Sequence, residues 1–256
     1  MRDPDSAAEK IADIIRLDSG LAASTLRVAN SAAYGRGMPI ADLAQAIVVL
    51  GGREIYKIAA AAMLARWEEM HQESLPWSPG AFSRHSFSVA VAAEVVGRIV
   101  GAGDSTNAYS AGLVGDIGRI SLAFICAASY PEIGALVRSG DCRWEEAESK
   151  VLGYNNRDVG ASLMKSWNFP PAFVTMVLFI ANPDGAAESD RAFLAQMHAA
   201  RYLANSLAPQ GTPDEFLFEP HPEFLARNGY TEEVLERALG EVREKTRGQF
   251  GHAFGH

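Results

Sequence analysis

"LAASTLRVANSAAYGRGMPIADLAQAIVVLGGREIYKIA", residues 21–59, decides the fold class of this chain. Its apolar residues recur every three or four positions in 21–30, in 42–52 and in the residues that follow, which is the spacing of one face of an α-helix. Apolar and polar residues nowhere alternate over the length of a strand. Pro39 and the pair Gly51-Gly52 interrupt the pattern and indicate turns. The stretch therefore predicts helices joined by short turns.

The same helical periodicity extends over the rest of the chain. Further apolar runs are "DSAAEKIADIIRLDSG", "SFSVAVAAEVVGRIV", "SAGLVGDIGRISLAFICAA", "VGASLMKSWNF", "AFVTMVLFIA" and "RAFLAQMHAARYLANSL". The breaks between them are short and turn-like, with Pro, Gly and Asn. No long linker and no internal repeat separates them. We therefore predict one all-α domain over residues 1–256, a multi-helix bundle, with two lobes that meet near Leu75–Gly80 as a variant of it.

Composition indicates a soluble protein with a sizeable core. The chain has 256 residues, of which 48% are hydrophobic, and this is enough to bury a core. The longest apolar run, Ile58–Ala65, is far shorter than the roughly 20 residues that a membrane-spanning helix needs, and the N-terminus lacks the apolar segment of a signal peptide. Cys126 and Cys142 form no CxxC motif, so a disulfide framework or thiolate zinc site has little to build on. We expect a cytoplasmic protein without a membrane partner.

Charge argues against nucleic acid as a partner. The net charge is −8, and residues 1–71 hold 8 Lys and Arg against 9 Asp and Glu. Residues 42–59 faintly resemble a helix-turn-helix around Gly51-Gly52, which leaves a DNA-binding regulator as an alternative. A surface that reads a DNA groove is expected to be plainly basic. We therefore expect no specific nucleic-acid partner.

"AGLVGDIGRI", residues 111–120, holds the most suggestive polar residue. An apolar helical run reaches Asp116 directly after Gly115, which has no side chain. The chain has no GxSxG elbow and no GxxxxGK[ST] loop, and neither cysteine has a histidine nearby in sequence that would suggest a dyad. None of these sequence patterns therefore indicates a set of catalytic residues.

Residues 21–59 resemble the opening segment of HDOD domains, and later blocks resemble the same family in the same order. The matching positions are Leu26, Arg27, Ala29, Asn30, Ser31, Tyr34, Gly35, Ile40, Gln45, Ala46, Ile47, Leu50 and Gly51. The resemblance covers about residues 10–210. Residues 211–256 then form a C-terminal helical extension, with a charged amphipathic helix predicted over 230–248. The resemblance implies the helical bundle of the HD phosphohydrolases and of the HD-GYP phosphodiesterases.

The resemblance also implies where metal ligands would stand. Active HD enzymes bring several histidines and two aspartates onto one or two divalent metals that activate water. By the resemblance, the corresponding positions here are His85, the pair Gly115-Asp116, Asn156, approximately Ile180 and Ala181, and Asn205. Only His85 and Asp116 keep a ligand side chain, and two such groups would hold a divalent ion loosely. We expect no metal, no cofactor and no catalysis.

The remaining polar residues have structural interpretations. A buried carboxylate without a metal needs donors, so we expect Asp116 to pair with His85 or Arg119, or to accept backbone amides. Asn156 and Asn205 keep hydrogen-bonding capacity without charge, although chance explains two asparagines equally well. Of the family motif, we expect Arg27, Asn30 and Ser31 to lock the first lobe through caps and a buried polar contact.

For function, the resemblance implies a non-catalytic module of bacterial signal transduction. Such a pseudoenzyme would dock onto another signalling protein, or would sense a ligand, a nucleotide-type molecule included, through a degenerate HD pocket. A residual metal-dependent phosphohydrolase or phosphodiesterase is the first alternative, and the DNA-binding regulator is the second.

Overall fold

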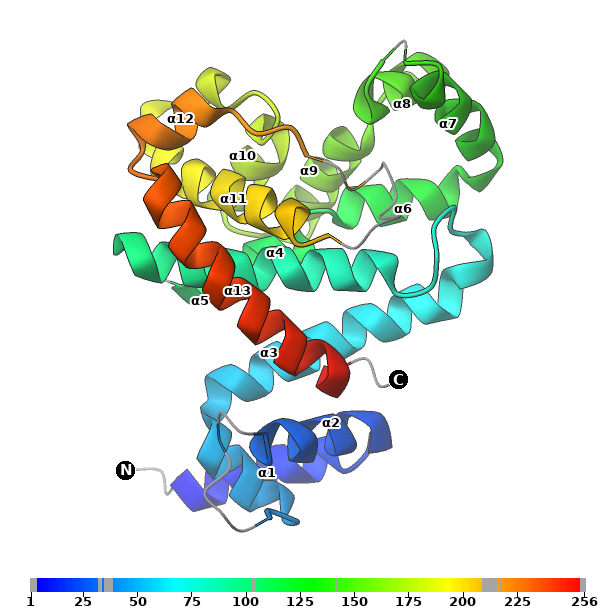
Figure 1. The fold of residues 1–256 in the computed structure, drawn as a ribbon. Coiled ribbons are helices and arrows are strands. Elements are labelled where there is room, and N and C mark those ends of the chain that lie inside the picture. Colours follow the sequence, from blue (N-terminus) through cyan, green and yellow to red (C-terminus); the bar gives the residue numbers. More distant parts are fainter. Residues whose placement is uncertain are drawn as a thin grey trace. The chain divides into compact units, whose positions relative to one another are not determined.

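The computed structural model describes residues 4–31, 34, 39–102, 105–140, 142–208, 216 and 218–253. Helices account for its regular structure, and none of these residues lies in a strand. The all-α fold expected from the periodicity is thereby confirmed. Figure 1 shows the helices in chain order.

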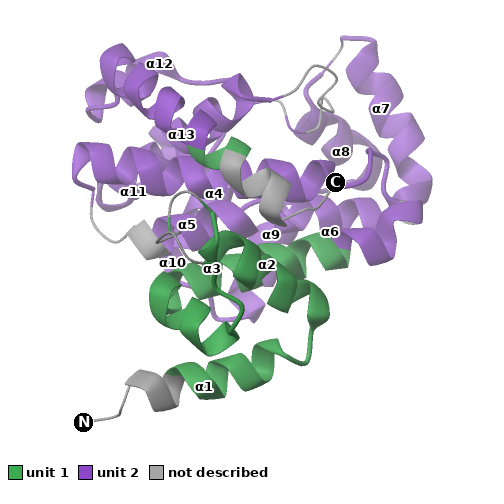
Figure 2. Cartoon of the chain, turned by 60° about the horizontal axis from the view of Figure 1, so that its bottom comes forward, with its two compact units in different colours: residues 1–67, 245–256 green, residues 68–244 purple. Residues whose placement is uncertain are grey.

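The chain divides into two compact units. One comprises residues 1–67 and 245–256, and the other comprises residues 68–244 (Figure 2). The division falls inside helix α3 (Leu43–His71), ahead of the predicted meeting point near Leu75–Gly80. Helix α3 continues without Pro or Gly from Arg53 to His71, and the turn at Leu75–Gly80 lies within the second unit.

The end of α13 (Glu232–Ala253), from Lys245 onward, belongs to the first unit. The unit otherwise contains α1 (Pro4–Ile15), α2 (Ser19–Ala29) and α3 up to Trp67. Apolar residues from all three, among them Ile15, Val28 and Ile47, form one buried cluster. Asp18 begins α2 as its N-cap, accepting hydrogen bonds from the backbone N–H groups of Gly20 and Leu21, both at 3.0 Å. The predicted break at Gly51-Gly52 is a kink in α3, where Gly51 adopts φ 77°.

Several family-motif residues make contacts within the first unit. The Asn30 side chain accepts from the Ile40 N–H and donates to the Ile40 carbonyl, both at 2.7 Å, and so ties the end of α2 to the chain before α3. Arg27 donates to the Ser24 hydroxyl at 3.3 Å. The Tyr34 N–H donates to the Ser31 carbonyl at 3.1 Å. These contacts fit a structural role, and Gly35 lies outside the described residues.

In the second unit, α4 packs against α5 and α11, and α9 packs against both α6 and α10 (Figure 1). The helix bounds are α4 (Ala81–Val100), α5 (Ser105–Val114), α6 (Ile117–Ile125), α7 (Tyr130–Arg138), α8 (Trp144–Leu152), α9 (Asn156–Ser166), α10 (Pro171–Phe179), α11 (Glu188–Ser206), α12 (Pro222–Arg227) and α13 (Glu232–Ala253). Short 3-10 turns, η1 (Gln72–Ser74), η2 (Ala127–Ser129) and η3 (Pro183–Gly185), follow α3, α6 and α10, respectively. Helix α13 corresponds to the charged helix predicted over 230–248.

Two glycines bring the helices of the second unit close together. A Cβ on Gly118 would overlap the Asn156 carbonyl oxygen and the Gly160 nitrogen, so α6 and α9 meet backbone to backbone. A Cβ on Gly112 would lie 2.6 Å from the Ala90 Cα, so α5 and α4 also meet backbone to backbone. These contacts place the start of α6, and with it Asp116, against the start of α9.

Among the described residues, no single helix has the length and apolar character needed to cross a membrane. One pair, Asn107–Ile125 with Ala127–Arg138, meets the length and composition criteria jointly but is bent by 84°.

Candidate functional site

The buried carboxylate of Glu68, which comes from α3, caps the start of helix α4, and α4 carries His85. Glu68 accepts hydrogen bonds from the backbone N–H groups of Phe82 at 3.0 Å and Ser83 at 2.9 Å, from the Ser83 hydroxyl, and from Trp77 Nε1 at 3.3 Å. A carboxylate at this end of a helix satisfies N–H groups that have no partner within the helix and complements its dipole. The first turn of α4 is therefore fixed, and His85 follows it directly.

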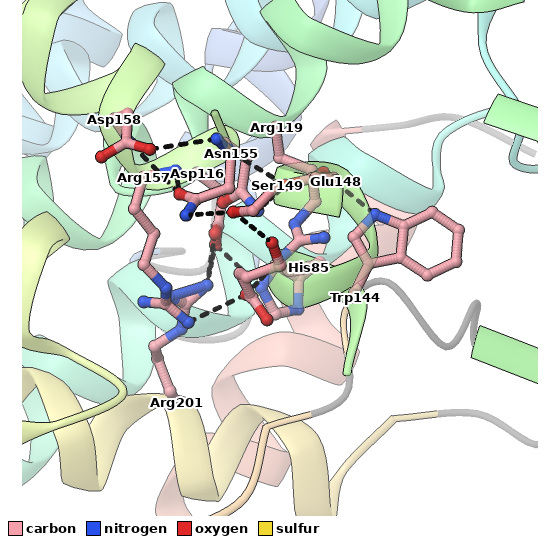
Figure 3. A network of polar contacts seen from close by, with 12 residues as sticks. His85, Asp116, Arg119, Trp144, Glu148, Ser149, Asn155, Arg157, Asp158 and Arg201 are labelled. Atoms are coloured by element: carbon pink, nitrogen blue, oxygen red, sulfur yellow. Dashed lines mark hydrogen bonds and ion pairs between the residues drawn. The ribbon is translucent and has the colours of Figure 1, made fainter. Parts of the chain in front are cut away.

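His85 and Asp116 meet, and Arg201 joins them from α11. His85 Nε2 lies 3.1 Å from Asp116 Oδ2. Arg201 Nη2 donates to both oxygens of the same carboxylate (Figure 3). The side chains of His85 and Asp116 are only 7% and 5% exposed. Asp116 is thus a buried carboxylate whose two oxygens both contact protein donors.

Two phenylalanines that follow α11 contact these side chains. The ring of Phe216 stacks on His85 at a centroid separation of 4.9 Å. The ring of Phe218 lies under the Arg201 guanidinium, at 5.5 Å. They add apolar contact to a site whose polar groups bond to one another.

Protonation states follow from this environment. Burial would raise the pKa of Asp116, but the charge of Arg201 and the contact with His85 outweigh it and hold that pKa well below its usual range. Burial, together with the positive charges of Arg201 and Arg119, lowers the pKa of His85 more than the Asp116 carboxylate raises it. At neutral pH the pair is therefore a charged carboxylate and a neutral imidazole, and Nε2 must carry the proton because it faces a carboxylate oxygen.

Of the two side chains expected from sequence to pair with Asp116, His85 does so, whereas the side chain of Arg119 bonds another carboxylate. Its Nη2 donates instead to Oε1 of Glu145 at 3.0 Å, and Arg157 Nη2 donates to the same oxygen at 2.9 Å. Burial would raise the pKa of Glu145, but the charges of Arg119 and Arg157 lower it to about 2. The Arg119 guanidinium acts on the Asp116 carboxylate as a nearby positive charge.

Asn156 serves a second buried carboxylate. Its backbone N–H and its side-chain Nδ2 donate to Oε2 of Glu148, at 2.7 Å and 2.6 Å. Trp144 Nε1 donates to Oε1 of Glu148 at 3.0 Å, and the Tyr130 hydroxyl donates to it at 3.4 Å. Burial raises the pKa of Glu148. The Asn156 amide, at a position where the family resemblance leads one to expect a histidine ligand, is therefore used as a hydrogen-bond donor.

The other sequence-predicted positions make different contacts. Asn205 donates to the Phe218 carbonyl at 3.4 Å. The carbonyl oxygens of Ile180 and Ala181 lie 3.1 Å from His198 Nδ1 and 3.0 Å from His221 Nε2. A Cβ on Gly115 would lie 2.9 Å from the Ala111 carbonyl oxygen, which leaves little space for a side chain. These positions thus contribute backbone contacts and hydrogen bonds to the surroundings of the pair.

Sequence reasoning missed Arg201, Arg157, Glu145 and Glu148. Arg201 lies one helical turn before Asn205, on the same face of α11, and that spacing is the one local signal that could have found it. Glu145 and Glu148 share a face of α8 three residues apart, a pattern that usually marks a solvated helix. Their burial depends on contacts between helices.

The residues present do not fit a divalent metal. No three His, Cys, Asp or Glu side chains in the described part of the chain come together in a way that could hold one. Arg201 occupies both oxygens of Asp116, and the Nε2 lone pair of His85 is replaced by a proton that points at Asp116. The arrangement can bind a ligand by charge and hydrogen bonds.

The HDOD domain family profile matches residues 1–183 of the chain. The chain belongs to the HDOD family. This confirms the resemblance found in the sequence, although the matched range begins at residue 1 and ends at Pro183. His85, Asp116 and Asn156 lie inside that range of the HDOD domain, whereas Arg201 and Asn205 lie beyond it.

Solved structures share the fold of this HDOD chain. An HDOD domain protein with unknown function from Geobacter sulfurreducens superimposes with a TM-score of 0.75 at 20% identity, covering 97% of this chain and 88% of that one. A protein from Marinobacter aquaeolei VT8, provisionally assigned to signal transduction, gives 0.72 at 18%, covering 95% and 54%. A provisionally assigned phosphohydrolase from Shewanella amazonensis SB2B gives 0.65 at 22%, covering 96% and 84%. No curated protein matches the chain in sequence.

Proposed function

We propose that this HDOD chain is a non-catalytic regulatory module of bacterial signal transduction, which acts by binding and not by hydrolysis. Its family and the relative provisionally assigned to signal transduction support a regulatory role. We propose further that the protein lies in the cytoplasm and that its binding partner is another signalling protein.

The observation that carries the proposal is the contact of Arg201 with Asp116. The guanidinium bonds both carboxylate oxygens, which are the atoms that a divalent ion would need as ligands. A metal would have to displace that cation and enter beside the further positive charge of Arg119. It would also have to replace the proton on Nε2 of His85, since a metal binds the imidazole lone pair. The site thus satisfies its retained carboxylate with protein groups.

The test is metal content combined with turnover. Purified protein is expected to carry no stoichiometric metal, and to release no product from cyclic dinucleotides or nucleotide phosphates when manganese, iron or magnesium is added. His85→Ala and Asp116→Ala serve as paired controls. Stoichiometric metal, or turnover that both variants abolish, would establish the residual phosphohydrolase and overturn the proposal.

A further inference from the structure

Three guanidinium groups from three different helices gather beside Asp116. Arg119 comes from α6, Arg157 from α9 and Arg201 from α11. Burial lowers the pKa of Arg157, and the positive charges of Arg201 and Arg119 lower it further. All three side chains are at most 14% exposed. Like charges are held together here with little water to screen them, which is costly unless an anion lies among them.

Besides Asp116, the carboxylate of Glu145 lies among these arginines, and it accepts from only part of their donors. One of its oxygens, Oε1, accepts from both Arg119 and Arg157. The buried Nε and Nη1 of Arg119 have no hydrogen-bond partner among the described residues, and neither does the buried Nε of Arg201. Buried donors without acceptors are rare in native proteins. The guanidinium groups therefore offer more donors than the neighbouring carboxylates use.

The other two carboxylates of the region cannot supply the missing acceptors. Asp116 is engaged by Arg201 and His85. Glu148 is engaged by neutral donors, namely Asn156, Trp144 and Tyr130. Of the carboxylates that bond to these arginines, Glu145 is the most exposed, at 24%. It lies in the first turn of α8. Its greater exposure makes it the carboxylate that an ion from solvent would reach first.

We propose that Arg119, Arg157 and Arg201 form a binding site for a phosphate-bearing anion, and that the Glu145 carboxylate occupies this site as an internal substitute when the anion is absent. A phosphate group presents more acceptor oxygens than the single Glu145 oxygen now used, and guanidinium groups bond it through paired N–H donors. The inference rests on the proposed function, since the anion is bound and not hydrolysed.

Displacement of Glu145 would give binding a structural consequence. Glu145 links the start of α8 to α6 through Arg119 and to α9 through Arg157. An anion that takes over both arginines releases this link, while the Glu148 contacts with Asn156 still hold the middle of α8. Occupancy of the site is thereby coupled to the position of the first turn of α8, next to Trp144.

The experiment is isothermal titration of the full chain with inorganic phosphate, adenosine monophosphate and adenosine. Wild type is expected to bind phosphate. Glu145→Gln, which removes the competing charge but keeps an acceptor, is expected to bind it roughly tenfold more tightly. Arg157→Gln is expected to lose roughly tenfold or more. The matched control is Arg227→Gln, because Arg227 makes an exposed pair with Asp184 in the same unit; its affinity is expected to equal that of wild type.

The outcomes separate the ligand sources and the two proposals. Equal affinity for inorganic phosphate and adenosine monophosphate supports a site for free phosphate. Tighter binding of adenosine monophosphate, without binding of adenosine, supports a site for a nucleotide. Both outcomes uphold the inference. Absence of phosphate binding by wild type overturns it, as does equal binding by Arg157→Gln that circular dichroism shows to be folded. Should Glu145→Gln fail to fold, the comparison of wild type, Arg157→Gln and Arg227→Gln decides alone. Turnover of the monophosphate with added manganese would instead overturn the proposed function.

Discussion

A buried carboxylate must be paired even where no metal binds it, and at Asp116 the guanidinium of Arg201 meets that need. Asp116 is 5% exposed and its neighbour His85 is neutral, so Arg201 supplies the positive charge that bonds the carboxylate directly. Removing one partner of a buried ion pair leaves an uncompensated charge, which costs more than the pair itself contributes.

Arg201→Met is therefore expected to lower the free energy of unfolding by about 3 kcal/mol. The matched control is Arg98→Met, because Arg98 pairs with Glu241 at the surface with half of its side chain exposed; such pairs contribute about 0–1 kcal/mol. Urea unfolding of both variants measures the difference. Equal losses in the two variants would show that Arg201 is not essential to the burial of Asp116.

At this scale the sequence predicts the positions of His85 and Asp116, and their pairing as one alternative, but not the contact with Arg201. His85 and Asp116 could be found because local motifs surround them. Arg201 could not be assigned to Asp116, because the two are 85 residues apart in the chain and an arginine on an amphipathic helix is ordinarily solvated. Arg119 was the nearer candidate in sequence, but it bonds Glu145 from another helix.

At the scale of elements, periodicity predicts most of the fold. The apolar stripes of residues 21–59 become α2 and the first part of α3, with the kink at the predicted glycine, Gly51. The close approach of α6 and α9 was not predicted. Gly118 could equally have been a flexible position, and its close contact with Gly160 exists only once both helices pack. The candidate site depends on that contact, which is why its full set of residues required the structure.

The junction between α11 and α12 depends on a neutral histidine. His198 Nδ1 lies 3.1 Å from the Ile180 carbonyl oxygen, and His198 Nε2 accepts the backbone N–H of His221 at 2.8 Å. Nδ1 therefore carries the proton, and protonation of Nε2 would remove the acceptor. Burial, outweighing the bond to Ile180, lowers the pKa of His198 to about 4.

Because the folded pKa lies below the ordinary value of 6.5, the neutral form of His198 stabilises the folded state above pH 6.5. That contribution is lost as the pH falls toward about 4, and over this window it amounts to up to roughly 3 kcal/mol. His198→Asn is expected to show a flatter dependence of unfolding free energy on pH. Urea unfolding between pH 7 and pH 4.5 is the measurement, and parallel curves for wild type and variant would contradict this assignment.

At the scale of the whole molecule, the question is where the positive charge lies. The chain carries a net charge of −8. Arg119, Arg157 and Arg201 lie largely buried among carboxylates. A small anion can displace one carboxylate from such a cluster, but the backbone of a duplex needs several exposed cations along its length.

We therefore expect no sequence-specific DNA binding with a Kd below about 1 µM at physiological salt, which is the tightest value usual for non-specific binding. Residues 42–59 faintly resemble a helix-turn-helix in sequence and are helical on both sides of the kink at Gly51, yet the charges over residues 1–71 nearly cancel, and docking in a groove requires a basic face. A mobility-shift assay of the full chain with a pool of random duplexes checks this, with a run at low salt to detect purely electrostatic association. Enrichment of one sequence at physiological salt would restore the DNA-binding regulator as the better interpretation, because the geometry of residues 42–59 would then outweigh the charge argument.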